Sequence, residues 1–130
     1  RAGEAAGVSG IILSKDTVDI YNPKTVRSAM GSIMRVEAVT DDIENAVGEM
    51  KLRGLPVFAA VISDTARSLT DCDFSQGGAV MIGNEGNGLS DYDASLADIP
   101  LTIKMHGTIN SLNAAMAAGI IMWELSKTSE

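Results

Sequence analysis

Asn84 and Glu85 lie in a loop that contains three glycines in six positions, Gly83-Asn84-Glu85-Gly86-Asn87-Gly88. The loop follows four apolar residues, 79–82, which predict a buried strand that enters a tight turn. Glycines in such a turn indicate positive φ angles, or a backbone that another group approaches closely. Because open α/β sheets bind ligands at the carboxyl ends of their strands, the loop is a candidate wall of an active site. From these residues alone, a plain glycine-rich connection is an equally good interpretation.

A second polar segment, residues 108–113, contains Ser111 and Asn113 and precedes the longest helix that we expect. The free N–H groups and the positive dipole end at a helix start can bind anionic or polar ligand groups. The alternative is that Asn110 or Ser111 only caps the helix. The two interpretations are compatible.

Several other kinds of catalytic site find no support in the sequence. One histidine, His106, and one cysteine, Cys72, give no cluster of metal ligands, so we expect no metal. The phosphate-binding pattern GxxxxGK[ST] and the dinucleotide-binding pattern GxGxxG are both absent. A Ser-His-acid triad would need a GxSxG elbow, which the chain lacks. Cys72 lies in a polar loop and is a poor candidate for a nucleophile.

The composition predicts one α/β domain with a mainly aliphatic core. The chain has 130 residues, of which 45% are hydrophobic and only 4% aromatic. No apolar run reaches the ~20 residues that a membrane span needs, and the first residues do not resemble a signal peptide, so we expect no membrane partner. The single cysteine excludes an internal disulfide and favours a cytoplasmic location.

The charge is unevenly distributed along the chain. The net charge of −7 argues against extensive nucleic-acid binding. Residues 1–36 nevertheless carry five Lys and Arg and three Asp and Glu, whereas residues 37–130 carry five and fourteen. The basic residues could steer an anionic substrate, although on charge alone an ordinary charged surface is the better explanation.

Helical and strand patterns alternate along the sequence. We expect helices over residues 1–6, 24–30, 40–53, 91–96 and 111–127, and strands over residues 10–14, 35–39, 56–62, 79–82 and 99–103, with 63–76 mostly loop. This alternation predicts a parallel, mostly buried sheet with helices on both faces. The chain starts without a methionine or an N-cap, so we expect a single domain over residues 1–130 that is truncated at its N-terminus.

Three stretches of the chain resemble the motifs of the SpoU (TrmH-like) RNA 2′-O-ribose methyltransferases of the SPOUT class. RAGEAAGVSGIIL, at the start, is similar to the second half of the first motif of this family. GNEGNGLS is similar to the second motif, and IKMHGTINSLNAAMAAGIIMWEL is similar to the third. The likeness covers nearly the whole chain, in the right order and spacing.

The resemblance implies a parallel α/β sheet with a C-terminal trefoil knot, and S-adenosylmethionine as the cofactor. By position, the cofactor-binding residues are Gly83, Asn84, Gly86, Ile103, Met105 and Leu112, and the catalytic residues are Arg1, Glu85, Ser111 and Asn113. Arginine normally stays protonated, so we expect Arg1 to position a phosphate and the ribose hydroxyl, and its action as a general base stays open. Ser111 and Asn113 would hold the arginine and the ribose. Asn84 and Glu85 would fix the loop, and a carboxylate also suits a cationic sulfonium.

The function implied by the resemblance is methyl transfer from S-adenosylmethionine to a ribose 2′-hydroxyl of tRNA or rRNA. It also implies a homodimer through the last helix, whose apolar stripe is Leu112, Met116, Ile120 and Trp123. Two alternatives stay open: a non-catalytic relative that binds RNA or the cofactor, and a small-molecule nucleotide-binding domain. Because the chain is acidic and Arg1 is a terminal residue, we expect it to bind the cofactor but to methylate RNA poorly.

Overall fold

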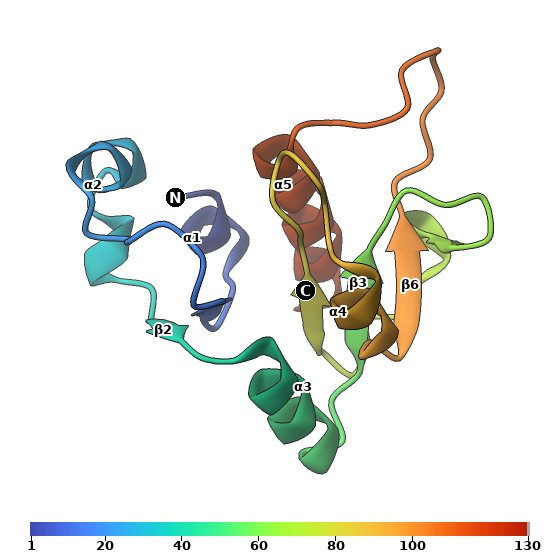
Figure 1. Ribbon diagram of the computed structural model, residues 1–130, viewed down its shortest axis with the longest axis horizontal. Coiled ribbons are helices and arrows are strands. Elements are labelled where there is room, and N and C mark those ends of the chain that lie inside the picture. The colour runs from blue at the N-terminus through green and yellow to red at the C-terminus, as the bar shows by residue number, and fades with distance from the viewer. Residues whose placement is uncertain (130) are drawn as a thin grey trace.

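The structure, a computed structural model, describes residues 1–129 and contains two parallel sheets (Figure 1). The smaller sheet pairs β1 (Ile11–Leu13) with β2 (Ala38–Thr40). The larger sheet has the order β4-β6-β3-β5, from strands β4 (Arg67–Ser68), β6 (Ile99–Thr102), β3 (Val57–Ala60) and β5 (Ala79–Met81). The predicted mixed α/β class with parallel strands is confirmed, but the strands form two sheets and not one.

The five α-helices described in residues 1–129 are α1 (Ala2–Ala6), α2 (Pro23–Ala29), α3 (Ile43–Leu52), α4 (Asp91–Ser95) and α5 (Ala114–Ser126). Short 3-10 turns cover Ser32–Met34, Leu69–Asp71 and Lys127–Ser129. Gly7 ends α1 with φ 75°, and cap amides donate to the carbonyls of Glu4 and Gly3. Figure 1 shows α5 behind the larger sheet and α4 in front of it.

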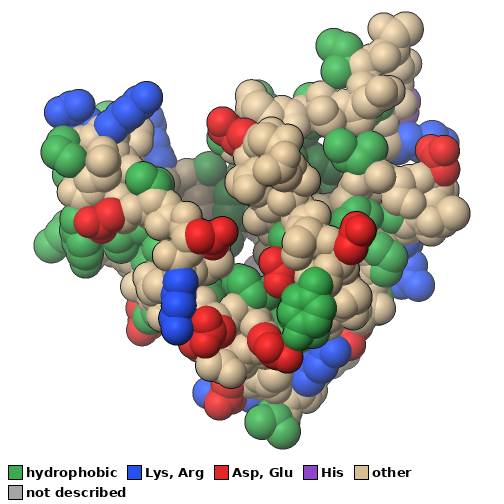
Figure 2. Space-filling view, viewed as in Figure 1, with side chains coloured by type: hydrophobic (Ala, Val, Ile, Leu, Met, Phe, Trp, Pro, Cys, Tyr) green, Lys and Arg blue, Asp and Glu red, His purple; other side chains and the backbone are tan. Residues whose placement is uncertain are grey.

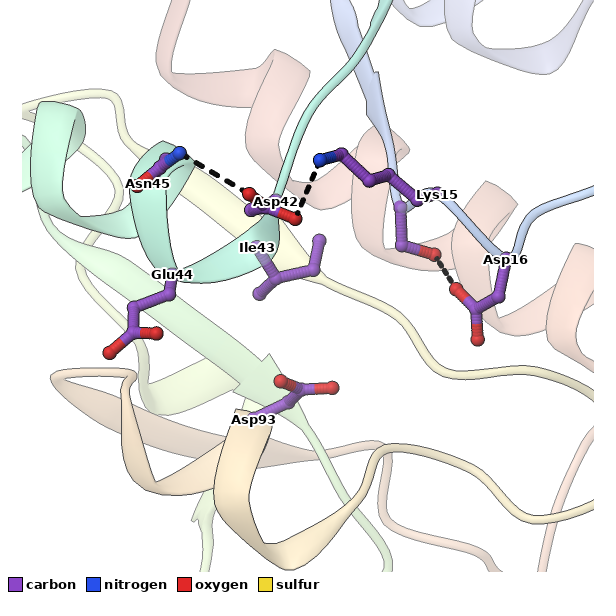
Figure 3. Close-up of a pocket in the computed structure, with 8 residues that line it drawn as sticks. Lys15, Asp16, Asp42, Ile43, Glu44, Asn45 and Asp93 are labelled. Atoms are coloured by element: carbon purple, nitrogen blue, oxygen red, sulfur yellow. Dashed lines mark hydrogen bonds and ion pairs between the residues drawn. The ribbon is translucent and has the colours of Figure 1, made fainter.

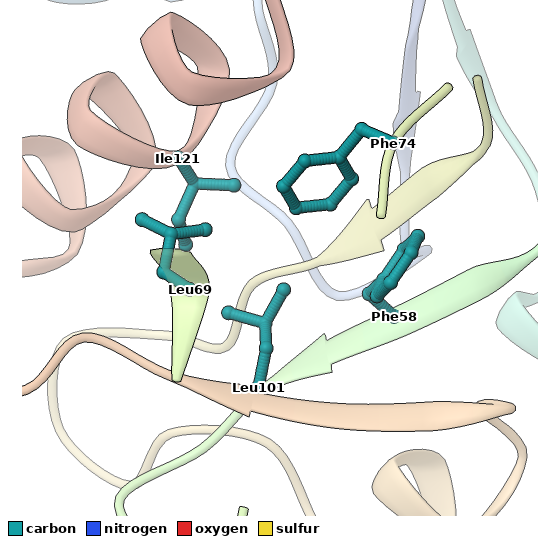
Figure 4. Packing of buried hydrophobic residues seen from close by; sticks show 5 residues of the cluster. All are labelled: Phe58, Leu69, Phe74, Leu101 and Ile121. Carbon is teal, nitrogen blue, oxygen red and sulfur yellow. The ribbon is translucent and has the colours of Figure 1, made fainter. Parts of the chain in front are cut away.

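The core lies between the larger sheet and α5 (Figure 4). Phe58 of the central strand β3 pairs in register with Val80 of β5 and Ile99 of β6, and its side chain is fully buried. The cluster of buried side chains is Phe58, Leu69, Phe74, Leu101 and Ile121. The rings of Phe58 and Phe74 lie 4.8 Å apart at 58°, a tilted contact that aromatic pairs favour. The core predicted as aliphatic therefore has both phenylalanines of the chain at its centre.

Gly3 of α1 joins the N-terminal part of the chain to α5. It is buried, and a Cβ there would lie 3.0 Å from Cγ2 of Val8 and 3.5 Å from Sδ of Met122. A larger residue would push α1 away from α5. This contact therefore fixes the position of the smaller sheet and α1 against the rest of the fold.

Most predicted elements differ from the structure by one or more residues, and the differences include the second strand, the loop 63–76 and the last helix. The second strand covers Ala38–Thr40 and not 35–39, because the chain first makes the 3-10 turn Ser32–Met34. Within the predicted loop 63–76, Arg67 and Ser68 form β4 by pairing with Leu101 and Thr102 of β6. The last helix begins at Ala114 and not at Ser111.

Candidate functional site

The loop 83–88 follows β5 and is closed by its own hydrogen bonds. The Gly88 amide donates to the Asn84 carbonyl at 3.1 Å, and the Asn87 amide donates to the Asn84 side-chain oxygen at 2.7 Å. Asn84 therefore fixes the loop, as the resemblance implied for this residue. The turn has the short-range pattern by which Asn side chains stabilise a tight bend.

Gly83 lies directly under the closing end of this loop. A Cβ at Gly83 would lie 2.0 Å from the carbonyl carbon of Gly88 and 2.2 Å from the Leu89 amide nitrogen. The sequence suggested that a ligand approaches this backbone, but in the structure the space that a Cβ would take is filled by the loop itself. Gly83 is thus required for loop closure, whatever else the loop binds.

Gly86 and Glu85 are exposed at the tip of the loop. A Cβ at Gly86 would meet only the side-chain oxygen of Asn84, at 3.7 Å, which is an ordinary contact. The Glu85 carboxylate has no hydrogen bond to any residue in the range 1–129, so Glu85 does not fix the loop as the resemblance implied. Both residues are therefore accessible to a ligand, although the structure shows no packing reason for a glycine at position 86.

The segment 104–112, which connects β6 to α5, is open to solvent along most of its length. In the described part of the chain, its main-chain N–H and C=O groups form no hydrogen bonds with protein groups. Figure 1 shows the segment rising beyond the end of β6 before it returns to α5. Ile103 and Met105 are half-buried, and Leu112 and Ser111 are exposed. Unpaired main-chain groups next to aliphatic side chains are available to bind a ligand.

Asn113 caps α5, and its side-chain oxygen accepts a hydrogen bond from the Met116 amide at 2.8 Å. The prediction that Asn110 or Ser111 caps this helix is therefore wrong, because the helix begins later and Asn113 is its N-cap. Because the oxygen of Asn113 is used by the cap, its amide nitrogen is the group that can donate to a substrate.

An apolar hollow of about 680 Å³ lies between α1 and α5, and Asn113 is the one sequence-predicted catalytic residue that lines it. Ala2, which follows Arg1, and Asn113 both line it, with the remainder supplied by Ala115, Met116, Gly119, Ile120, Trp123 and Glu124. Arg1 is exposed at the start of α1. Glu85 does not line this hollow.

A polar cluster that sequence reasoning missed holds α1 in place. Glu4 of α1 accepts hydrogen bonds from the hydroxyl of Ser32, the one buried polar side chain described in residues 1–129, and from the guanidinium of Arg35. A further bond from Arg35 Nη2 to Glu4 Oε2 measures 3.1 Å, and Nη2 also donates to the Met30 carbonyl at 3.4 Å. No spacing in the sequence indicates a contact between residues 4 and 35. The cluster fixes the helix that follows Arg1.

We expect Glu4 to make folding stability dependent on pH. The bonds from Arg35 and Ser32 lower the pKa of Glu4 from 4.5 to about 2. A carboxyl whose pKa is lowered by folding stabilises the protein fully above its unfolded pKa and loses this effect as the pH falls through its folded pKa. Wild type should therefore lose more stability than Glu4→Gln as the pH falls from about 4.5 to about 2. Urea unfolding of both proteins across this range measures the difference, and parallel losses would contradict it.

A second hollow, of about 350 Å³, lies near α3 and α4 and is acidic (Figure 3). Its lining carries four carboxylates and one lysine, namely Asp16, Asp42, Glu44, Asp93 and Lys15, and Lys15 already pairs with Asp42 at 3.2 Å. Tyr92 donates to Glu44 at 2.8 Å, and the negative Glu44 raises the pKa of this phenol. Excess negative charge makes this hollow unsuitable for a phosphate-containing ligand.

Two other kinds of site, a metal centre and a reactive thiol, find no support in residues 1–129. Within residues 1–129, no group of three or more His, Cys, Asp or Glu side chains is placed to hold a metal ion. Cys72 is half-buried, its thiol donates to the Ser68 carbonyl at 3.4 Å, and burial raises its pKa, which disfavours the thiolate. No helix among these residues is both long and apolar enough to span a membrane.

Comparison with known protein families gives a match over nearly the whole chain. The sequence profile of the SpoU rRNA Methylase family matches residues 1–123, which include α1, the loop 83–88 and the start of α5. The chain belongs to the SpoU rRNA methylase family. Membership confirms the resemblance that the three sequence motifs indicated.

Two relatives of the chain are named as 23S rRNA 2′-O-methyltransferases. The chain is 32% identical over 125 residues to the 23S rRNA (guanosine(2553)-2′-O)-methyltransferase RlmP of Bacillus subtilis, covering 96% of this chain and 50% of that protein. It is 34% identical over 129 residues to the 23S rRNA (uridine(2479)-2′-O)-methyltransferase of Streptomyces viridochromogenes, covering 95% and 45%. The chain thus spans about half the length of these relatives.

Solved structures of SpoU relatives share the fold. The AdoMet-bound rRNA methyltransferase from Sinorhizobium meliloti superposes with a TM-score of 0.87 at 32% identity, over 98% of this chain and 49% of that one. The SpoU methyltransferase AviRb from Streptomyces viridochromogenes, in complex with AdoMet, gives a TM-score of 0.86 at 32% identity, over 99% and 51%. Two similar folds are therefore known with this cofactor bound.

Proposed function

We propose that residues 1–130 form the single SpoU-type catalytic domain of a protein that transfers a methyl group from S-adenosylmethionine to a ribose 2′-hydroxyl of rRNA or tRNA. The observation that carries the proposal is the fold shared with the AdoMet-bound rRNA methyltransferase from Sinorhizobium meliloti, at a TM-score of 0.87. The relatives named as 2′-O-methyltransferases support the same reaction.

The residues at the two loops fit the cofactor. An adenosyl group needs an apolar slot and a few main-chain hydrogen bonds. The segment 104–112 offers unpaired main-chain groups, and Ile103, Met105 and Leu112 supply aliphatic surface beside it. The loop 83–88, which Asn84 holds closed, would form the other wall. When bound, S-adenosylmethionine would supply a methyl group on a cationic sulfur, which the exposed Glu85 carboxylate would favour electrostatically.

Arg1, Ser111 and Asn113 would act on the RNA. The 2′-hydroxyl must lose its proton as its oxygen forms the new bond to carbon. An arginine stays protonated at neutral pH, so Arg1 would hold the neighbouring phosphate and orient the hydroxyl. Asn113 can donate from its amide nitrogen, since its oxygen caps α5, and the exposed Ser111 hydroxyl is free to bind the ribose or the arginine.

The proposal also includes three features besides the reaction. These are a C-terminal trefoil knot made by the segments around the cofactor, a homodimer through α5, and a cytoplasmic location. Exposed apolar side chains on α5 support the dimer, because Met116 is 54% and Trp123 61% exposed beside the hollow that they line. The absence of any cysteine besides Cys72 fits a reducing compartment.

We expect Trp123→Asp to abolish the proposed dimer. The indole ring is large and exposed in one copy, and an aspartate at the centre of an interface would leave a buried, unpaired charge. Light scattering at micromolar concentration should give a dimer for wild type and a monomer for the variant. The matched control is Tyr92→Asp on α4, another exposed aromatic, which should stay dimeric. A monomeric wild type would contradict the dimer.

The test of function is a map of ribose methylation in rRNA and tRNA from cells that lack the gene. We expect the loss of one 2′-O-methyl group, which returns when the gene is restored. In parallel, calorimetry should detect binding of S-adenosylmethionine by the purified chain. Cofactor binding with an unchanged methylation map would favour a non-catalytic relative. Failure to bind the cofactor would favour a different nucleotide as ligand.

A further inference from the structure

We propose that the exposed surface of α2 and the turn before it, formed by Tyr21, Lys24 and Arg27 and called here the α2 face, docks the sugar-phosphate backbone of the RNA substrate. The inference rests on the proposed function and adds to it a specific contact surface. Figure 2 shows Lys and Arg side chains gathered over the part of the molecule where Figure 1 places α2.

The local charge around α2 is opposite to that of the chain. Residues 20–36 contain Lys24, Arg27 and Arg35 and neither Asp nor Glu, so the remaining residues hold seven bases and seventeen acids. A polyanion is repelled by most of this protein and attracted to this segment. Because phosphate contacts supply most of the affinity for nucleic acids, the segment is where an RNA backbone gains binding energy.

The two basic side chains of the α2 face are free to bind a ligand. Within residues 1–129, ion pairs occupy five of the basic side chains, namely Lys15, Arg35, Lys51, Arg53 and Lys127. Lys24 and Arg27 have no carboxylate partner among the same residues, and both are exposed. Their spacing of three residues places them on the same side of α2, so they can contact one backbone together.

Tyr21 adds an aromatic ring to this basic surface. It directly precedes the N-cap Asn22 and is 69% exposed. An exposed ring beside basic side chains is the combination that stacks an unpaired base while the cations hold its phosphates. Because stacking of an unpaired base uses the ring and phosphate contacts use the cations, we assign the α2 face to RNA.

The α2 face is held rigidly against the helix that follows Arg1. Asn22 caps α2 by accepting from the Lys24 amide at 3.0 Å, and Pro23 occupies the first helical position. At the other end, Arg35 bonds both to Glu4 of α1 and to the carbonyl of Met30, the C-cap of α2. An RNA bound to α2 would therefore be docked on a unit that includes α1, the helix that follows Arg1.

The test measures binding of a fluorescein-labelled, mixed-sequence RNA hairpin to this chain at several salt concentrations. Lys24→Gln/Arg27→Gln should weaken binding and reduce the slope of log K against log salt by about 1.4–1.8, which corresponds to two lost phosphate contacts. The matched control, Lys51→Gln/Arg53→Gln at the end of α3, removes the same charge and should leave the slope unchanged. Tyr21→Ala should weaken binding about tenfold and Tyr21→Phe should restore it, since the ring is retained.

Calorimetry with S-adenosylmethionine separates this inference from the proposed function. We expect every variant to bind the cofactor like wild type. An unchanged salt slope in the α2 variant, or an equal loss in the α3 control, would overturn the α2 face and leave the proposed function standing. A wild-type chain that binds the cofactor but not the hairpin would also overturn it. Tighter binding of poly-glutamate than of the hairpin would assign the surface to an acidic protein, which again overturns the inference.

Discussion

Gly83→Ala should abolish binding of S-adenosylmethionine in a chain that still folds. The new methyl group would lie 2.0 Å from the Gly88 carbonyl carbon and 2.2 Å from the Leu89 nitrogen. These are backbone atoms, which cannot rotate away as a side chain can, so the loop must shift by about 1 Å or more. Calorimetric titration with S-adenosylmethionine measures the loss of affinity.

Two other glycines give matched controls for this change. Gly48→Ala introduces the same methyl group on α3, where nothing lies within 4 Å, and should stabilise the helix slightly without affecting the cofactor. Gly86→Ala changes the same loop but meets only Asn84 Oδ1 at 3.7 Å, so any loss of affinity there reports contact with the ligand. Cofactor binding by Gly83→Ala equal to that of Gly48→Ala would show that loop closure is not needed.

Phe58→Ala should cost about 3–5 kcal/mol of unfolding free energy. The ring is fully buried on the central strand of the larger sheet and packs against Phe74 at 4.8 Å. Removal of the ring would leave a cavity in the core. Its neighbours Leu101 and Ile121 are fully buried themselves, so no mobile surface side chain is at hand to fill it. Domains of this size are stable by about 5–15 kcal/mol, so the variant should be close to unfolding at room temperature. Urea denaturation measures the change.

Two leucine variants show how much a buried and an exposed side chain each contribute to the unfolding free energy. Leu101→Ala removes a fully buried side chain and should cost about 2–5 kcal/mol. Leu52→Ala makes the same change at a position that is 86% exposed and should stay within about 0.5 kcal/mol of wild type. If Phe58→Ala were as mild as Leu52→Ala, the cluster shown in Figure 4 would not be the stabilising core.

Strands with a strong apolar pattern could be predicted from the sequence. Residues 57–59 of β3 are all buried because neighbours cover the strand on both faces, and such strands are continuous apolar runs in the sequence. β4 has no such signal. Arg67 and Ser68 become a strand only because Leu101 and Thr102 pair with them, and this contact joins residues 34 positions apart. Pairings of this kind are decided by the tertiary fold and not by local pattern.

The candidate site shows the same division between local and distant contacts. The turn at Asn84 was predictable, because its hydrogen bonds link residues three and four positions apart. The cluster of Glu4 with Ser32 and Arg35 was not, since its members are 28 and 31 positions apart. The roles of Arg1, Ser111 and Met105 came from family resemblance alone, because nothing in their neighbours' spacing identifies them.

The two loops of the candidate site differ in internal order, and this difference determines where the entropy change of ligand binding arises. The loop 83–88 is already closed by Asn84 and by packing at Gly83, so it is preorganised and loses little freedom when a ligand arrives. The segment 104–112 has no hydrogen bonds of its own among the described residues, so at the proposed site we expect it to lose most of the conformational entropy on cofactor binding. Affinity can therefore be raised by stiffening 104–112, without any new contact to the ligand.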